Sequence, residues 1–298
     1  MKKNLLSGLL TLSLFATACS GTPETSDKIS VVTSFYPLEF LVKEIAKDHV
    51  SLTTLVPSGV EPHDYELTPQ DVGTIEESQV LIVNGVLEPW FKDVEKNLES
   101  TTVSILNMSK AMTLLDSSDP EEKGKDPHLW LDPVLMSQMA DLVRDELIQA
   151  DPENSTAYQS NTVVLKQKLN NLNDGYKTGL KNCAQKSFVT SHAAFAYLAQ
   201  EYGLTQVAIS GLSPDAEPSA QKLKEIVDFV RANKVTVIFF ESLVSTSLSD
   251  TIANEVGAQT LVLNPIEGLT AAQREAGENY FNIMEENLAN LKIALTCQ

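Results

Sequence analysis

Residues 152–175 read PENSTAYQSNTVVLKQKLNNLNDG, with no proline or glycine between the first and the last residue of the stretch. Its apolar residues recur at helical spacing, for example at Val163, Leu165, Leu169 and Leu172. This pattern predicts one long amphipathic helix. The stretch decides the fold because it lies in the middle of a chain of 298 residues and separates two parts with the same alternating pattern.

Short apolar runs rich in β-branched residues alternate with helical patterns on both sides of this helix. The predicted strands are residues 29–34, 50–56, 79–84 and 102–106, and then 187–191, 206–210, 235–241 and 259–263. The predicted helices include residues 38–46, 70–78 and 90–98, and a closing helix at 272–295. Alternating short strands and helices predict α/β domains with buried parallel sheets. We therefore expect two Rossmann-like lobes, at residues 29–150 and 183–298, joined by a rigid helix at 151–182.

The first residues have the pattern of an export signal. Lys2 and Lys3 precede an apolar run at residues 5–18, which is followed by Cys19. The run is shorter than the about 20 residues that cross a bilayer, so we predict a cleaved signal peptide at residues 1–18. The sequence ATAC at residues 16–19 resembles the lipobox of bacterial lipoproteins, which implies lipidation of Cys19. The alternative is an ordinary signal peptide.

Residues 19–28 are mostly small and polar, which predicts a flexible tether between lipid and folded domain. The protein is thus expected to be exported, and lipid-anchored on the outer face of the cell membrane or in the periplasm. The net charge of −18 argues against nucleic-acid binding, which requires basic patches.

Two further cysteines remain if Cys19 carries lipid. Cys183 and Cys297 then form the one possible pair in an oxidising compartment. A disulfide between them is a hypothesis, and two unpaired buried thiols are the alternative.

Three of the four histidines lie in loops that we expect at the edge of a sheet. His63 lies in a loop before the helix start at Thr68 and Pro69, His128 lies in a loop, and His192 lies where a strand becomes a helix. His49 has no partner motif and is interpreted as structural. In α/β proteins, ligands bind at the carboxyl edge of the sheet. Neutral imidazoles suit zinc, copper, iron or nickel, and three imidazoles with one carboxylate make a four-coordinate zinc site.

Three carboxylates are candidates for the fourth ligand: Glu61, Glu241 and Glu267. Glu267 stands between Pro265 and Gly268 in a predicted rigid turn, which is suited to present one side chain. Glu241 could instead accept a hydrogen bond from the free N–H of a ligating histidine. Sequence order alone leaves this choice open.

Six motifs in one order resemble the zinc-binding lipoproteins of ABC importers, of the ZnuA and AdcA type. The motifs are SFYP at residues 34–37, PHDY at 62–65, DPHLWLDP at 126–133, TSHAAF at 190–195, GLSPDAEPS at 211–219 and NPIEGL at 264–269. The resemblance covers residues 29–298. It implies a receptor that binds one Zn²⁺ between two α/β lobes and delivers it to a permease with its ATPase, acting as a monomer.

The resemblance also implies the ligand set His63, His128, His192 and Glu267. Some relatives carry aspartate where this chain has Asn264, a poor metal ligand. Manganese receptors of the same cluster use a carboxylate as third ligand, so His192 favours zinc. Many zinc relatives carry a histidine-rich loop, whereas residues 116–125 here are acidic and contain no histidine.

Three alternatives remain beside the zinc receptor. A manganese receptor of the same cluster would differ in its cargo. A surface adhesin is suggested by roles assigned to lipoproteins of this family, although no adhesive motif is present. A zinc hydrolase would need an open coordination position, and the chain has no His-Glu-x-x-His motif. We therefore expect a binding protein rather than an enzyme.

Overall fold

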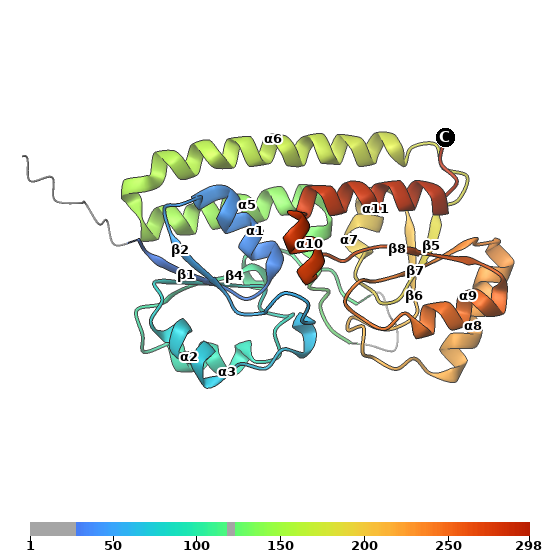
Figure 1. Ribbon diagram of the computed structural model, residues 1–298, viewed down its shortest axis with the longest axis horizontal. Coiled ribbons are helices and arrows are strands. Elements are labelled where there is room, and N and C mark those ends of the chain that lie inside the picture. Colours follow the sequence, from blue (N-terminus) through green and yellow to red (C-terminus); the bar gives the residue numbers. More distant parts are fainter. Residues whose placement is uncertain (1–27, 118–122) are drawn as a thin grey trace, which may run out of the picture.

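The computed structural model describes residues 28–117 and 123–298 and contains two α/β lobes that lie side by side (Figure 1). The N-terminal lobe is built on a parallel sheet in the order β2-β1-β3-β4. Its strands are β1 (Ser30–Thr33), β2 (Ser51–Thr54), β3 (Val80–Val83) and β4 (Ser104–Asn107).

Helices cover both faces of this sheet because its central strands are apolar on both sides. Val31 belongs to one buried cluster and Val32 to a second one on the opposite face. The elements are α1 (Tyr36–Ala46), η1 (Pro62–Asp64), α2 (Pro69–Glu76), α3 (Phe91–Leu98), α4 (Met108–Ala111), η2 (Leu129–Leu131) and α5 (Pro133–Ala150). Helices α1 and α5 lie on the side of the linking helix, and α2 and α3 lie on the other side (Figure 1).

The C-terminal lobe repeats the arrangement with a parallel sheet in the order β6-β5-β7-β8. Its strands are β5 (Ser187–Thr190), β6 (Thr205–Ala208), β7 (Val237–Phe240) and β8 (Gln259–Val262). Its helices are α7 (Ala196–Glu201), α8 (Ala220–Asn233), α9 (Ser247–Val256), α10 (Ala271–Ala276) and α11 (Tyr280–Ala294). The predicted fold class is therefore confirmed.

A turn η3 (Pro152–Asn154) leads into helix α6 (Ser155–Gly179), which has 25 residues and runs along both lobes (Figure 1). It packs on α1 and α5 and on α11. Leu165, Leu169 and Leu172 are buried as their spacing predicts, whereas Val163 lies on the outer face and is 70% exposed. Tyr176 anchors the helix to the C-terminal lobe by donating a hydrogen bond to the Met284 carbonyl at 2.7 Å.

The single closing helix predicted at residues 272–295 is wrong. The chain forms α10 and α11 there, and Gly277 ends α10 in the left-handed region at φ 74°. Asn279 then caps α11 by accepting hydrogen bonds from the N–H groups of Phe281 and Asn282. A glycine that ends a helix and an asparagine that starts the next one explain the break.

The predictions for the signal peptide, for lipidation of Cys19 and for most of the tether lie outside the described residues. Within residues 28–117 and 123–298, no helix is both long and apolar enough to span a bilayer.

Cys183 and Cys297 form the expected disulfide, which links residues 114 positions apart. Closing a loop of this length restricts the unfolded chain, so we expect reduction to lower the free energy of unfolding by about 2–5 kcal/mol. The Cys183→Ser/Cys297→Ser variant should match the reduced protein in urea denaturation, and the denatured oxidised protein, residues 22–298, should show no free thiol. Equal midpoints for oxidised and reduced protein would contradict this prediction.

Candidate metal site

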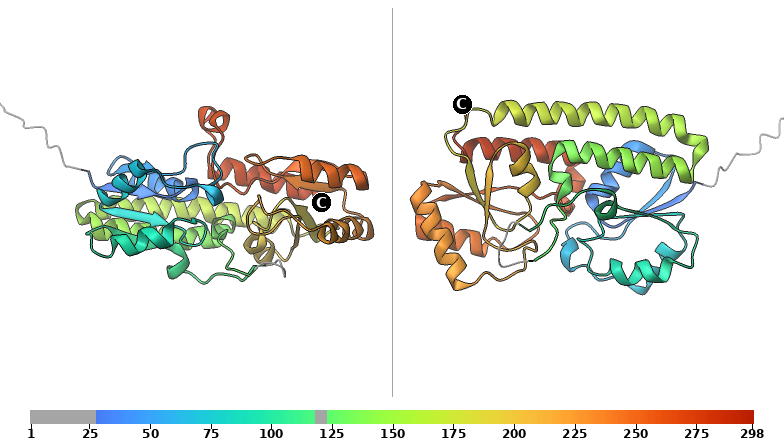
Figure 2. Two further views of the ribbon diagram at one scale, coloured as in Figure 1. Left: turned by 90° about the horizontal axis from the view of Figure 1, so that it is seen from below. Right: turned by 180° about the vertical axis from the view of Figure 1, so that it is seen from behind.

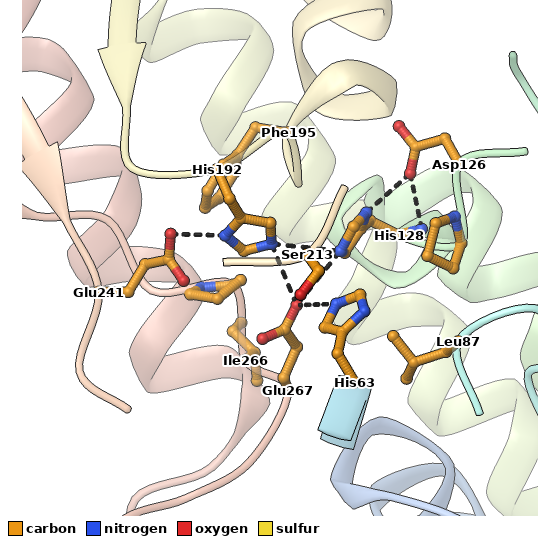
Figure 3. Close-up of polar contacts among 12 residues, drawn as sticks. His63, Leu87, Asp126, His128, His192, Phe195, Ser213, Glu241, Ile266 and Glu267 are labelled. Carbon is orange, nitrogen blue, oxygen red and sulfur yellow. Dashed lines mark hydrogen bonds and ion pairs between the residues drawn. The ribbon is translucent and has the colours of Figure 1, made fainter. Parts of the chain in front are cut away.

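Four side chains from both lobes converge between the sheets (Figure 3). His63 lies in η1, which follows β2, and His128 directly precedes η2. His192 follows β5, and Glu267 lies in the turn between β8 and α10. Each lobe thus contributes two side chains from loops near strand ends, where α/β sheets commonly bind ligands.

Four of the six distances between the donor atoms match a tetrahedral zinc site. The Nε2 atoms of His63, His128 and His192 lie 3.3, 3.2 and 3.4 Å from Glu267 Oε1. The Nε2 atoms of His128 and His192 are 3.3 Å apart, and all four donor atoms lie within 4.8 Å of one another. Zinc bonds of about 2.0–2.1 Å in a tetrahedron place neighbouring ligand atoms about 3.3–3.4 Å apart. The four distances therefore have the length of the edges of such a tetrahedron.

The group is buried and opens toward one side. The side chains of His128, His192 and Glu267 are fully buried, while His63 is 9% exposed. His63 also lines a cavity of 530 Å³ together with Tyr65 and Trp90. Access to the donor atoms is therefore expected on the side of His63.

Two carboxylates outside the group fix the histidine rings. His128 Nδ1 lies 2.8 Å from Asp126 Oδ1, and His192 Nδ1 lies 2.6 Å from Glu241 Oε1. A carboxylate accepts a hydrogen bond, so each Nδ1 donates and each Nε2 keeps its lone pair. The two Nε2 lone pairs face each other at the centre of the group (Figure 3). A metal ion or a proton between the two nitrogens stabilises this arrangement.

The pKa shifts of His192 and Glu267 also indicate a site for positive charge. Burial opposes the charged form of His192, but the carboxylates of Glu241 and Glu267 outweigh it and raise its pKa well above the usual value. Burial also opposes the charge on Glu267, yet the three histidines hold its pKa well below the usual value. Its Oε2 atom is buried and has no hydrogen-bond partner in the described parts of the chain. A buried carboxylate requires a nearby positive charge.

The turn that carries Glu267 is held rigidly. Ile266 has a φ of 58°, which is strained for a β-branched residue, and its N–H donates to Asn264 Oδ1 at 2.7 Å. The Trp130 indole N–H donates to the Pro265 carbonyl at 2.7 Å. This hydrogen bond ties the segment of His128 to the turn of Glu267.

Of the predicted site residues, the structure brings together His63, His128, His192 and Glu267, and places Glu241 behind His192. Glu61 is not in the group: its Oε1 accepts the backbone N–H of His63 at 3.2 Å. Burial and the charge of Glu267 raise the pKa of Glu61 to about 9, so it is neutral near pH 7. His49 contacts the Tyr158 ring instead.

The sequence reasoning missed Asp126, although its position two residues before His128 was a usable signal. Its side chain is fully buried, and its Oδ1 also accepts the backbone N–H of His128 at 2.9 Å. Asp126 and Glu241 therefore have equivalent roles in the two lobes.

Replacing Glu241 by glutamine tests this interpretation. The amide keeps the size of the side chain but removes the negative charge behind His192. We expect the affinity for Zn²⁺ to fall about 10–100-fold, the usual effect of losing such a partner. Asp126→Asn should have an effect of similar size, and an unchanged affinity in both variants would contradict the role.

The comparisons with known proteins agree with the site. Residues 31–294 match a family model described as "Zinc-uptake complex component A periplasmic". The chain is 39% identical over 304 residues to the zinc-binding lipoprotein AdcA of Streptococcus pneumoniae. The matched region covers 98% of this chain and 61% of that protein. It is 39% identical over 281 residues to the high-affinity zinc uptake system protein ZnuA of Bacillus subtilis, covering 90% and 88% of the two chains.

Solved structures show the same fold. The Zn(II)-bound ZnuA-like domain of Streptococcus pneumoniae AdcA has a TM-score of 0.79 at 40% identity, and covers 90% of this chain and 99% of that one. The laminin-binding protein Lmb of Streptococcus agalactiae, described as having adhesin and metal-transporting activity, has a TM-score of 0.80 at 33% identity, with 90% and 99% coverage. The chain therefore belongs to the family of zinc-uptake complex A components, which are extracytoplasmic by the family's own description.

Proposed function

We propose that this protein is the extracytoplasmic receptor of a zinc ABC importer, which binds one Zn²⁺ between its lobes and delivers it to the permease. One observation carries the proposal. Three imidazole nitrogens and one carboxylate oxygen converge with four separations of 3.2–3.4 Å. These are the separations that four-coordinate zinc requires. The similarity to AdcA and ZnuA supports the same conclusion.

The donor set favours zinc over manganese as the cargo. Mn²⁺ prefers six oxygen ligands, whereas this group offers three nitrogens and one oxygen. The two histidines fixed by Asp126 and Glu241 leave little freedom to admit further ligands.

The remaining parts of the proposal follow from this role. The partners are a permease and its ATPase, and the receptor is held at the membrane through a lipid on Cys19 and acts as a monomer. It is not an enzyme: Glu267 takes the fourth position, which a hydrolytic zinc site keeps open for water.

A competition titration tests the function directly. The metal-stripped soluble protein, residues 22–298, is titrated with Zn²⁺ in the presence of excess Mn²⁺. We expect one equivalent of zinc to bind and excess manganese to leave it in place. Preferential binding of manganese would favour the manganese receptor, and absence of stoichiometric zinc binding would refute the proposal.

Adhesion is a second candidate, favoured by the similarity to Lmb. It would be additional to metal capture and would use the outer surface. The test is binding to immobilised laminin by the wild-type protein and by a variant without His63, His128 and His192. Equal binding by both proteins would support an adhesive surface, whereas no binding by the wild type would remove this candidate.

A further inference from the structure

The loop that carries His63, residues 57–67, is fastened to the opposite lobe at two points. The Gly59 N–H donates to the Leu269 carbonyl at 2.9 Å, and Arg274 Nε donates to Ser58 Oγ at 2.5 Å. Leu269 and Arg274 both follow Glu267 in the segment that continues into α10. The loop that carries His63 is thus joined to the segment that follows Glu267.

Arg274 has a second anchor on the N-terminal lobe. Its Nη1 and Nη2 atoms donate to the two carboxylate oxygens of Glu39 on α1 at 2.9 and 3.1 Å. The Glu39 side chain is only 5% exposed, whereas Arg274 is 40% exposed. A bidentate ion pair of this kind fixes both the position and the orientation of the guanidinium. Because Glu39 fixes the guanidinium, the hydrogen bond from Arg274 also holds Ser58 in place.

We propose that Arg274 is a positioning residue that latches the His63 loop over the bound metal and so slows its release. The inference rests on the proposed zinc function and adds a residue that controls it. When Arg274 releases Ser58, the loop at residues 57–67 keeps only the Gly59–Leu269 hydrogen bond of the two that fasten it to the segment behind Glu267. His63 is the ligand that moves with this loop, so it leaves the metal first.

The surroundings of Arg274 indicate that the latch is not needed for folding. Helix α10 projects from the body of the molecule (Figure 2), and a capping box between Thr270 and Gln273 stabilises its start. Glu39 also pairs with Lys43, so the loss of Arg274 does not leave a buried carboxylate without a cation. The side chain of Arg274 can therefore be changed with little effect on the fold.

The test measures how fast zinc leaves the protein. Zinc-loaded wild type and Arg274→Ala, both residues 22–298, are mixed with excess chelator in a stopped-flow instrument. We expect Arg274→Ala to release zinc about tenfold faster, since a paired, partly exposed arginine makes a modest contribution to holding the loop. Arg231→Ala is the matched control, because Arg231 forms a surface ion pair with Glu255 within one lobe. Its release rate should equal that of the wild type.

Two further variants separate a latch from a general loss of stability. In a His63→Ala background, Arg274→Ala should leave the release rate unchanged, because the loop no longer carries a ligand. Arg274→Lys keeps the positive charge but cannot make the two parallel hydrogen bonds of a guanidinium. It should release zinc at an intermediate rate. Wild-type release by Arg274→Ala, or an equal acceleration with and without His63, would overturn the latch. Absence of zinc binding by the wild type would instead refute the proposed function.

Discussion

Replacing Glu267 by alanine is expected to lower the affinity for Zn²⁺ at least about a hundredfold, more than the roughly 10–100-fold effect of losing a partner behind a ligand. The carboxylate contributes a ligand atom, and it is the shared neighbour of all three imidazoles. Without it, three buried nitrogens face a divalent ion with no negative charge in contact with the metal. The measurement is competition against a chelator of known zinc affinity.

Glu61→Gln is the matched control for this variant. Glu61 lies two residues before His63 and was a candidate for the fourth ligand, but it caps η1 and its raised pKa keeps it neutral near pH 7. We expect its replacement by the isosteric amide to change zinc affinity much less than Glu267→Ala. If Glu61→Gln had the larger effect, the fourth ligand would be Glu61 and the assignment to Glu267 would be wrong.

Acidification from pH 8 to pH 5 is expected to release the metal. Zinc binds neutral imidazole, so each proton that must leave a histidine lowers the apparent affinity by about tenfold per pH unit below the pKa of that histidine. The carboxylates around His128 and His192 outweigh burial and raise the pKa of both in the metal-free protein. The affinity should therefore begin to fall above pH 6.5 rather than below it.

His63 should respond at lower pH than the other two histidines. Burial lowers its pKa, and the neighbouring Glu267 offsets this effect only in part. A zinc titration at half-unit steps of pH should thus give a slope that steepens toward pH 5. In Glu241→Gln, the loss of the carboxylate lowers the pKa of His192, so the onset should move to lower pH. An affinity that did not depend on pH would rule out histidine ligation.

The sequence predicted the strands and the histidines well because both depend on local patterns. All eight predicted strand regions overlap a strand, since short β-branched runs between turn residues leave few alternatives. His63 and His192 were recognisable because each follows an apolar run, and His128 because it lies in the motif DPHLWLDP at residues 126–133.

The fourth carboxylate could not be chosen from the residues alone because its position depends on contacts between distant segments. Glu267 is placed by the bond from Trp130 to Pro265 and by the strained backbone of Ile266. The bond from Trp130 arises only when segments 135 positions apart pack together. The break at Gly277 was a local signal that the helical periodicity on either side obscured. The ion pair between Arg274 and Glu39, which positions the latch, joins residues 235 positions apart, and no pattern along the chain predicts it.

Trp130 also gives the protein an intrinsic optical reporter. Its buried ring lies 5.3 Å from the ring of His128, and the chain has just one other tryptophan, Trp90. Indole emission responds to the charge of an imidazole at this distance, so a change from protonated to zinc-bound His128 should alter the fluorescence. With Trp90 replaced by phenylalanine, the signal would come from Trp130 alone, and loading and release could be followed without an attached dye.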